Sequence, residues 1–529
     1  MKRITTALIA VLLLSTFAFS GGIVTNTNQS AAWTRYFARY ATTDIDAVYF
    51  NPAGLSKLND GFHFSLNNQS IWQTQTISND FPYLVYGPDY VGDVKAPLFP
   101  GVYFAWKTGK FTISAGFNPI GGGGGATFNN GLPSFELLTG VNLVGMLNEM
   151  GIPTSQYTES LFFEGRSVYY GIQAGLTYEI NDFISVAAGA RYVMANNSYN
   201  GYLKDLMINP MAPPINDGSM VRADEFFVTA SGLYAQASQD AAVASAGLTA
   251  AIGAGIIVGD DPLANQTLID ALTDVGVYFP GMTNTQAAGT FGIVSDEAAN
   301  SALEAGATAT LVTDQEVEYE QKGSGITPML SVHLSPAKIL DVAFKYEFKT
   351  KLQLTNHTTS DFLVGYDETG TPITMFPDGE VSNADMPALL SGAANVRPLQ
   401  GLQLSVGFEY YWDKNVNWDG LENEIDNNSY NINGTAQYTI KDKVMISASY
   451  GFASMGVNKS YQSDLDYSLS SSSIGFGAGW NITENVTVNA GYVMVFYQDD
   501  SVPTGEPVMY TQFYGKDTNI FAVGVDFSF

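Results

Sequence analysis

The chain has 529 residues, of which 14% are charged, 13% are aromatic and 53 are glycine, a composition that is unusual for a soluble globular protein. Its formal net charge of −28 argues against a nucleic-acid partner, because phosphate contacts require Lys and Arg. The absence of cysteine excludes a lipidated N-terminus, a disulfide framework and thiolate chemistry.

Residues 1–20 have the pattern of a secretory signal peptide. Lys2 and Arg3 form a short positive region, residues 7–19 are apolar, and residues 18–20 offer a small-x-small cleavage pattern. The apolar run is too short and wrongly flanked for a membrane anchor. We therefore expect the chain to be exported and residues 1–20 to be removed.

Residues 61–529 are dominated by two-residue alternation. In the last segment, Phe521, Val523, Val525, Phe527 and Phe529 alternate with small or polar residues, which gives a strand with one apolar face. Strands of about 10–13 residues suit a tilted crossing of a bilayer. About fourteen segments fit the pattern, an even number as single-chain barrels require. They are residues 61–72, 99–107, 110–118, 165–180, 183–197, 326–335, 339–353, 386–397, 401–412, 428–440, 443–455, 470–482, 485–497 and 515–529.

The predicted connections alternate between tight turns and long loops. Residues 181–182, 441–442 and 483–484 form tight turns, whereas the longest loop covers residues 198–325. Short periplasmic turns and long external loops are typical of outer-membrane barrels. The sequence therefore predicts an all-β fold, a transmembrane antiparallel barrel with a large external loop at 198–325.

A chain-breaking segment follows the third predicted strand. It consists of Pro119, Gly121, Gly122, Gly123, Gly124 and Gly125. Proline cannot donate a ladder hydrogen bond, and successive glycines weaken strand pairing. Two interpretations stay open, a poorly closed place in the barrel wall or the start of a flexible external loop. No Lys-Ser or Lys-Thr pair follows, which excludes a phosphate-binding loop.

Within the long loop, residues 241–259 carry no charge and are nominally long enough to cross a membrane as a helix. The stretch is mostly Ala and Gly, and Asp240, Asp260 and Asp261 flank it. We favour a loop helix, because one poor helix does not fit a chain of period-two strands.

Several ionisable residues fall on the predicted lumen face: His63, Glu179, Arg191, His333, Lys345, Glu347 and Glu409. A carboxylate ligand in a pocket of low dielectric needs a cationic partner. Arg191 and Lys345 are therefore candidate ligand-binding residues. The alternative is that both belong to an ordinary polar lumen, with Lys345 paired to Glu347.

The segment 21–60 carries an Asn-Pro-Ala motif at Asn51, Pro52 and Ala53, shortly after an Asp-Ala pair. The hairpin at 175–193 reads GLTYEINDFISVAAGARYV, and the chain ends on an aromatic residue, as the assembly signal of outer-membrane barrels does. Together these features resemble the FadL family of transporters for hydrophobic compounds. The resemblance implies that residues 21–60 form a hatch, or plug, inside a fourteen-stranded barrel.

The resemblance also implies a function. Members of this family take up hydrophobic molecules passively, such as long-chain fatty acids or aromatic hydrocarbons. The ligand reaches a pocket in the barrel, the hatch shifts, and the ligand leaves sideways at a kinked third strand, for which Pro119 and the glycines after it are the counterpart. The family often has phenylalanine where this chain has Ile23, which makes Ile23 a candidate ligand contact. The expected partners are hydrophobic small molecules, outer-membrane lipid or lipopolysaccharide, and the barrel-assembly machinery.

Catalysis and metal binding find little support. The chain has 3 histidines and lacks both an HExxH pair and a GxSxG elbow. Residues 415–426 partly match a calcium loop, but the leading Asp and the bidentate Glu are missing. We expect no enzymatic activity, no cofactor and no metal ion, although a hydrolase built from Ser, His and Asp stays open.

Two other functions stay open as well. One is a non-transport barrel that acts as an adhesin or receptor through residues 198–325. The other is a general porin, which would need an open, charged lumen, whereas residues 21–60 are apolar and aromatic enough to block one. For the barrel itself we expect Arg to be costly at the lipid-facing Leu404 and milder at the lumen-facing Gln403 or Gly407.

Overall fold

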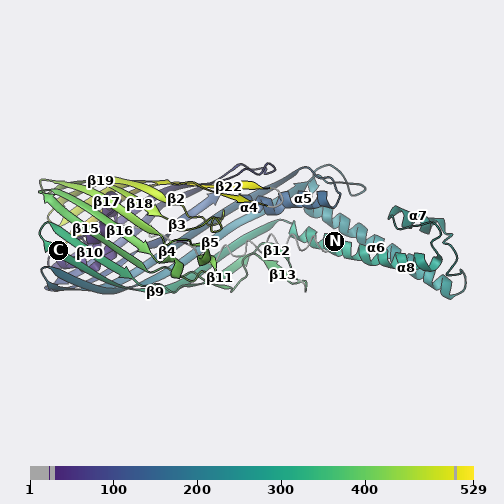
Figure 1. Ribbon diagram of the computed structural model, residues 1–529, viewed down its shortest axis with the longest axis horizontal. Coiled ribbons are helices and arrows are strands. Elements are labelled where there is room, and N and C mark those ends of the chain that lie inside the picture. Colours follow the sequence, from purple (N-terminus) through teal and green to yellow (C-terminus); the bar gives the residue numbers. More distant parts are fainter. Residues whose placement is uncertain (1–22, 24–29, 368, 506–508) are drawn as a thin grey trace. The chain divides into compact units, whose positions relative to one another are not determined.

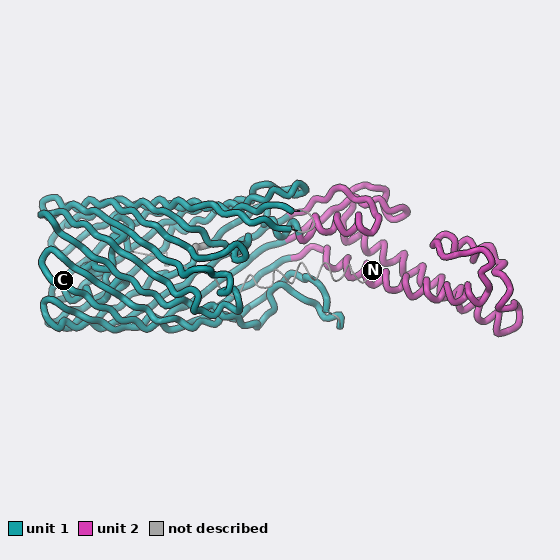
Figure 2. The backbone as a smooth tube through the Cα atoms, in the orientation of Figure 1, with its two compact units in different colours: residues 1–137, 161–202, 316–529 teal, residues 138–160, 203–315 magenta. Residues whose placement is uncertain are grey.

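The computed structural model describes residue 23 and residues 30–367, 369–505 and 509–529 (Figure 1). The predicted signal peptide, residues 1–20, lies outside the described residues. The chain divides into two compact units. Unit 1 comprises residues 1–137, 161–202 and 316–529, and unit 2 comprises residues 138–160 and 203–315 (Figure 2).

Unit 1 contains a closed antiparallel β-barrel, which has 14 strands in the described part of the chain. β1 pairs with β22 from His63 opposite Ser528 to Asn79 opposite Gln512, and this pairing closes the ring. The predicted all-β barrel is thus confirmed. Its strands are β1 (Gly61–Asn79), β2 (Asp89–Thr108), β3 (Phe111–Phe128), β4 (Tyr157–Asn181), β5 (Ile184–Ile208), β9 (Gln315–Ala337), β10 (Leu340–Glu347), β15 (Leu389–Leu399), β16 (Leu402–Tyr411), β17 (Tyr430–Ile440), β18 (Val444–Ser454), β19 (Ser471–Thr483), β20 (Val486–Tyr497) and β22 (Tyr510–Ser528).

Short elements occupy the connections. The strands are β6 (Met211–Ala212), β7 (Asn216–Asp217), β8 (Val221–Arg222), β11 (Gln353–Ser360), β12 (Leu363–Tyr366), β13 (Pro372–Thr374), β14 (Val381–Asn383) and β21 (Asp500–Thr504). The helical segments are α4 (Pro133–Glu136), η3 (Leu137–Val141), α5 (Asn142–Glu149), η4 (Asp413–Asn415) and η5 (Leu421–Glu424).

Several barrel strands are longer than predicted. β4 and β5 each have 25 residues, and β9 has 23. At about 3.3 Å per residue, 25 residues extend over about 80 Å, whereas the apolar band of an outer-membrane barrel is about 25 Å tall. On β9 the outer face is apolar at Leu330 and Ile326 and polar beyond them, at Ser324, Lys322 and Glu320. The additional length therefore lies outside the apolar band.

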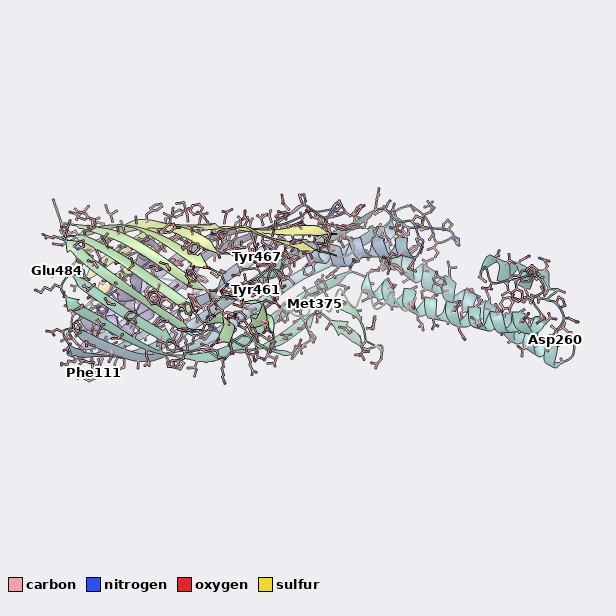
Figure 3. All side chains as sticks on the ribbon, in the orientation of Figure 1. Phe111, Asp260, Met375, Tyr461, Tyr467 and Glu484 are labelled. Carbon is pink, nitrogen blue, oxygen red and sulfur yellow. The ribbon has the colours of Figure 1, made fainter. Side chains whose placement is uncertain are left out.

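The two faces of the barrel follow the predicted alternation. On β16, Leu404 and Val406 are 44% and 62% exposed, whereas Ser405 and Glu409 are buried. Figure 3 places Phe111 and Glu484 at the end of the barrel that carries the short turns. The face assignment is confirmed for the ionisable residues that the structure buries, which are His63, Arg191, His333, Lys345, Glu347 and Glu409.

Unit 2 contains a pair of long helices, α6 (Ala223–Gly253) and α8 (Asn284–Leu311), together with α7 (Gln266–Asp274). Ser231, Ser238 and Ser245 of α6 donate their hydroxyls to backbone carbonyls of α8 at distances of 2.7–2.9 Å. Their spacing of one heptad places these small side chains on the face that meets α8. Of the predicted loop helix at 241–259, residues 241–253 form the second half of α6, and residues 254–259 lie beyond its end at Gly253. Among the described residues, no helix combines the length and the apolar character needed to cross a bilayer.

Candidate functional site in the barrel lumen

Residues 30–57 of unit 1 form a chain of very short helices. These are α2 (Ala31–Arg35), η1 (Arg39–Ala41), α3 (Ala47–Phe50) and η2 (Pro52–Lys57). The Ser30 hydroxyl caps α2 by accepting from the Trp33 amide, and the Asn51 side chain caps η2 by accepting from the Ala53 amide. Helices of this length are not stable alone, so contacts with the surrounding strands must hold the segment.

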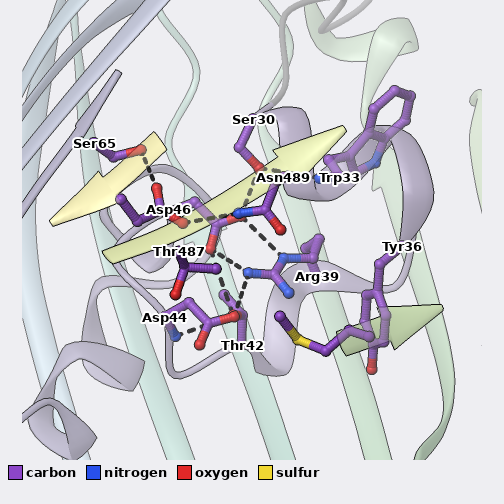
Figure 4. A network of polar contacts seen from close by, with 12 residues as sticks. Ser30, Trp33, Tyr36, Arg39, Thr42, Asp44, Asp46, Ser65, Thr487 and Asn489 are labelled. Carbon is purple, nitrogen blue, oxygen red and sulfur yellow. Dashed lines mark hydrogen bonds and ion pairs between the residues drawn. The ribbon is translucent and has the colours of Figure 1, made fainter. Parts of the chain in front are cut away.

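An ion network stabilises the first half of this segment from within (Figure 4). The Arg39 guanidinium contacts the carboxylates of Asp44, at 2.8 Å, and Asp46. The Asp46 carboxylate also accepts the Ser30 hydroxyl at 2.5 Å. Arg39 and Asp46 are almost wholly buried, and a buried charge requires such pairing.

Arg35 and Tyr36 fasten the segment to strands in the second half of the barrel, between β15 and β20. The Arg35 guanidinium donates to Asn489 on β20, at 2.9 Å, and to Ser447 on β18, at 2.8 Å. The Tyr36 hydroxyl contacts Asn395 on β15 at 3.2 Å. The lumen is filled here, because a Cβ added at Gly407 would lie 3.3 Å from the Ala38 backbone. An Arg side chain at Gly407 would therefore meet the segment, which argues against the milder cost predicted at this position.

The Asn-Pro-Ala motif fastens the segment to the opposite wall. The Asn51 side-chain amide donates to the Val332 carbonyl on β9 at 3.1 Å, and the Ala53 backbone amide donates to the Ser331 hydroxyl at 3.1 Å. The Pro52 carbonyl accepts from Thr177 on β4 at 2.7 Å, and the Ala53 carbonyl accepts from Ser185 on β5 at 2.8 Å. The strands β4, β5 and β9 thus hold the Asn-Pro-Ala motif of the N-terminal segment.

Arg191 and Lys345, the predicted ligand-binding cations, meet at one carboxylate. Glu347 accepts Arg191 at 2.7 Å and Lys345 at 2.6 Å. The Lys345 ammonium also donates to the Tyr49 carbonyl at 2.8 Å, and both cations lie about 5 Å from the Tyr49 ring centre. All three charged side chains are at most 6% exposed. This arrangement, the Glu347 ion group, connects the barrel wall to the N-terminal segment.

Ile23 lies apart from the Glu347 ion group. Its backbone amide donates to the Tyr461 hydroxyl at 2.9 Å, and its side chain packs against Val416, Trp418 and Ile425. These residues belong to the connections after β16 and β18. The predicted ligand contacts are therefore not brought together at one place.

The ladder between β2 and β3 is interrupted. Val94 pairs with Ala126 and Val102 pairs with Phe117, and the register is irregular between these two pairs. The β3 residues in this interval include Pro119 and the predicted glycines, whose pairing with β4 continues through Pro119, Gly121, Gly124 and Gly125. The segment is thus part of β3, and the interpretation as the start of a loop is wrong.

Nearby side chains satisfy backbone groups beside the interruption. Asn68 and Ser70 of β1 donate to the Pro97 carbonyl at 3.1 and 2.8 Å, and Asn68 accepts the Phe99 amide at 2.9 Å. The Asn118 amide donates to the Pro119 carbonyl at 2.9 Å. Such compensation is what an interrupted ladder in a barrel wall requires.

The inner side of the wall beside the interruption is apolar. Phe99 of β2 and Val168 of β4 form one buried cluster with Phe37 of the N-terminal segment. Ile120, within the interrupted stretch of β3, is wholly buried. An apolar surface therefore extends from the segment in the lumen to the interrupted ladder.

No protein-family model matches the chain, and no curated protein matches it. Solved structures do. A FadL homologue from Pseudomonas aeruginosa is 12% identical, with a TM-score of 0.57, and the match covers 96% of this chain and 99% of that one. The toluene transporter TodX from P. putida is 12% identical, with a TM-score of 0.50 and coverage of 92% and 95%. The chain has the FadL-type fold. The resemblance expected from the sequence is confirmed at this level.

Sequence reasoning missed some residues of the site in this FadL-type barrel. No pattern in the sequence indicated that Arg35 and Tyr36 connect the segment to the wall. The sequence pattern pairs Lys345 with Glu347 as one alternative, but it indicates neither that Arg191 joins them nor that Glu409 accepts the Tyr40 hydroxyl. A lumen-facing carboxylate two residues from a lumen-facing lysine, as Glu347 is from Lys345, is the signal that could have identified the ion group.

Proposed function

We propose that this protein is an outer-membrane channel for the passive uptake of hydrophobic molecules, such as long-chain fatty acids or aromatic hydrocarbons. The observation that carries the proposal is the combination of a FadL-type barrel with an interrupted β2–β3 ladder that has an apolar lining. The apolar outer band and the short turns support placement in a bacterial outer membrane.

We propose that residues 21–60 are the hatch of this channel. Support comes from the buried helices between Ser30 and Lys57 and from their hydrogen bonds to strands on both sides of the lumen. Aromatic side chains, including Phe37, Tyr40 and Phe50, occupy space that a general porin would leave to water. The porin alternative is therefore disfavoured.

We propose lateral release at the segment formed by Pro119 and Gly121–Gly125. Pro119 pairs with Tyr170, which is the last outward aromatic residue of β4 before the charged Arg166 and Glu164. The interruption therefore lies at the outer edge of the apolar band. A ligand that leaves there enters lipid directly and avoids about 0.8 kcal/mol for each methylene exposed to water.

The ligand contacts are part of the same proposal. Arg191 and Lys345 would hold a polar ligand headgroup once it competes with Glu347 for them, and Ile23 would respond to ligand near the external connections. Because both cations already have a carboxylate partner, a carboxylate ligand must replace that partner rather than meet a free charge.

The most direct test of the proposed function is a comparison of uptake and conductance. The full-length protein, expressed in cells that lack their own long-chain fatty-acid channel, should restore uptake of a labelled fatty acid or of toluene. Large, steady ion conductance in planar bilayers without uptake would instead identify a porin. Mass spectrometry of co-purified lipids and hydrocarbons would name the ligand class.

An adhesin or receptor function is the second candidate, and one observation favours it. The α6–α8 pair of unit 2 exposes apolar residues such as Val243, Ile293 and Leu303 by 60% or more. Loss of cell or surface binding after removal of residues 223–311, with uptake absent in both forms, would support this function.

A further inference from the structure

An open groove of about 750 Å³ lies on the outer surface of the barrel, away from the lumen. It is lined by Tyr192 of β5, by Ile326 and Pro328 of β9, and by Phe348, Lys349 and Lys351 of the chain between β10 and β11. All of these residues belong to unit 1. The groove is unrelated to the interrupted ladder, which involves β2 and β3.

The groove arises from an irregularity in the pairing of β9. Met329 pairs with Glu347 at the end of β10, and Gly323 pairs with Leu354 of β11, so the residues between these pairs leave the regular ladder. Pro328 cannot donate a ladder hydrogen bond, although its carbonyl accepts the Phe348 amide at 3.0 Å. Gly325 is required, because an added Cβ would lie 2.6 Å from the Lys351 carbonyl oxygen.

The groove is apolar on one side and basic on the other. Tyr192, Ile326 and Phe348 are 45%, 62% and 42% exposed on the outer surface. Lys349 is partly neutralised by Asp385 at 3.1 Å. Lys351 is exposed, and within the described residues it has no ion-pair partner. The chain as a whole carries 51 acidic and 23 basic residues. Two lysines beside an apolar surface are therefore a local positive site on a protein with a negative net charge.

The position of the groove relative to the apolar band fixes what it faces. On the side of the groove toward the short turns, Leu330 and Phe344 are outward-facing and apolar. On the side toward the long connections, the outer face of β9 carries Lys322 and Glu320. The groove therefore lies where the apolar band ends on the side of the long connections. In an outer membrane this is the level of the phosphorylated headgroups of the outer leaflet.

We propose that this groove binds a phosphorylated glycolipid of the outer leaflet, namely the lipid A part of lipopolysaccharide. Lys351, with help from Lys349, contacts a lipid A phosphate, and Tyr192, Ile326 and Phe348 contact its acyl chains. The inference rests on the membrane placement of the proposed function and is independent of which molecule the channel transports.

The test is native mass spectrometry of the full-length barrel titrated with bisphosphorylated lipid A. The Lys351→Glu variant should bind lipid A on the order of tenfold more weakly than the unaltered protein, because it loses a charge-assisted hydrogen bond. Lipid A from which both phosphates have been removed should bind the unaltered protein as weakly as the intact lipid binds the variant.

Lys95→Glu is the matched control. Lys95 is also exposed, at the same edge of the apolar band, opposite Trp72 of β1, but it does not line the groove. Equal weakening by the two substitutions would mean a diffuse charge effect and would overturn the proposal, as would equally tight binding of dephosphorylated lipid A. Fatty-acid uptake by the Lys351→Glu variant, measured in parallel, should be unchanged, which separates a failure here from a failure of the channel function.

Discussion

At the scale of single residues, the Glu347 ion group constrains the arrangement of side chains in the lumen. One carboxylate satisfies both Arg191 and Lys345, and all three side chains are withdrawn from water. Removing one partner of a buried ion pair leaves a charge without compensation, which costs far more than the intact pair contributes. The group therefore holds β5, β10 and the Tyr49 backbone of the N-terminal segment in one arrangement.

We predict that Glu347→Gln lowers the free energy of unfolding by roughly 3–5 kcal/mol, because two buried cations lose their counter-charge. Urea unfolding of the barrel in liposomes, followed by heat-modifiable mobility on gels, measures this. Glu179→Gln is the control. The Glu179 carboxylate is 19% exposed and lies 3.7–3.8 Å from Lys107 and Lys57, so its loss should cost about 1 kcal/mol or less. Equal costs would contradict the assigned role of the group.

The outer face offers a second test at this scale. Leu404→Arg places a charge in the apolar band and should cost roughly 2–4 kcal/mol. Asn200→Arg, on the exposed face of β5 beyond that band, should change stability by a few tenths of a kcal/mol, as surface substitutions do. Similar costs at both positions, in the same unfolding assay, would show that the band has been placed wrongly.

At the scale of elements, alternation of hydrophobicity located every barrel strand but not the full length of each. On β9 the predicted segment 326–335 is the part with an apolar outer face. The strand begins at Gln315, and there Glu318, Glu320 and Lys322 face out while Gln321 faces in. Val317 and Tyr319 face in with it and are buried, so alternation continues with the apolar side reversed. The extension was missed because the apolar outer face that marks a membrane-crossing strand is absent there.

The same limit applies to the candidate site. The motif at Asn51 and the chain-breaking segment at Pro119 and Gly121–Gly125 stand out in the sequence because each depends on local backbone chemistry. The partners of the motif, such as Thr177 and Ser331, lie 125 and 278 residues further along the chain. Nothing in a single sequence specifies which lumen-facing hydroxyl meets which carbonyl across the barrel.

The α6–α8 pair provides a prediction about a whole element. Replacing residues 223–311 with a short Gly-Ser linker should leave the barrel folded, because the two ends of the deleted segment lie close together. The Arg222 guanidinium at one end is 3.0 Å from the Asp314 carboxylate at the other. Uptake of a labelled fatty acid should then remain within about twofold of the unaltered protein, because the proposed hatch, ligand contacts and β2–β3 interruption all lie outside residues 223–311. A complete loss of uptake in a folded, surface-exposed variant would make unit 2 part of the transport route.

At the scale of the whole molecule, the account depends on where the ligand leaves. Release into water costs about 0.8 kcal/mol for each methylene, which is roughly a fourfold slower rate per methylene. Release into lipid at the β2–β3 interruption avoids this dependence on chain length. The variant that tests it should strengthen the ladder without disturbing β4.

A suitable variant is Pro119→Val with Gly121→Thr and Gly125→Thr. Gly122 is retained, because its φ is +85° and an added Cβ would lie 2.2 Å from the Ser167 carbonyl. An added Cβ at Gly125 meets no atom closer than 3.6 Å. Heat-modifiable mobility on gels would show that the variant still folds as a barrel.

The measurement that tests the central claim most directly is the uptake rate for a homologous series of labelled fatty acids in the unaltered protein and in this variant. The account predicts rates that depend weakly on chain length in the unaltered protein, and rates that fall about fourfold for each added methylene in the variant. Uptake by the folded variant at the unaltered rate along the whole series would contradict lateral release and favour passage through the hatch.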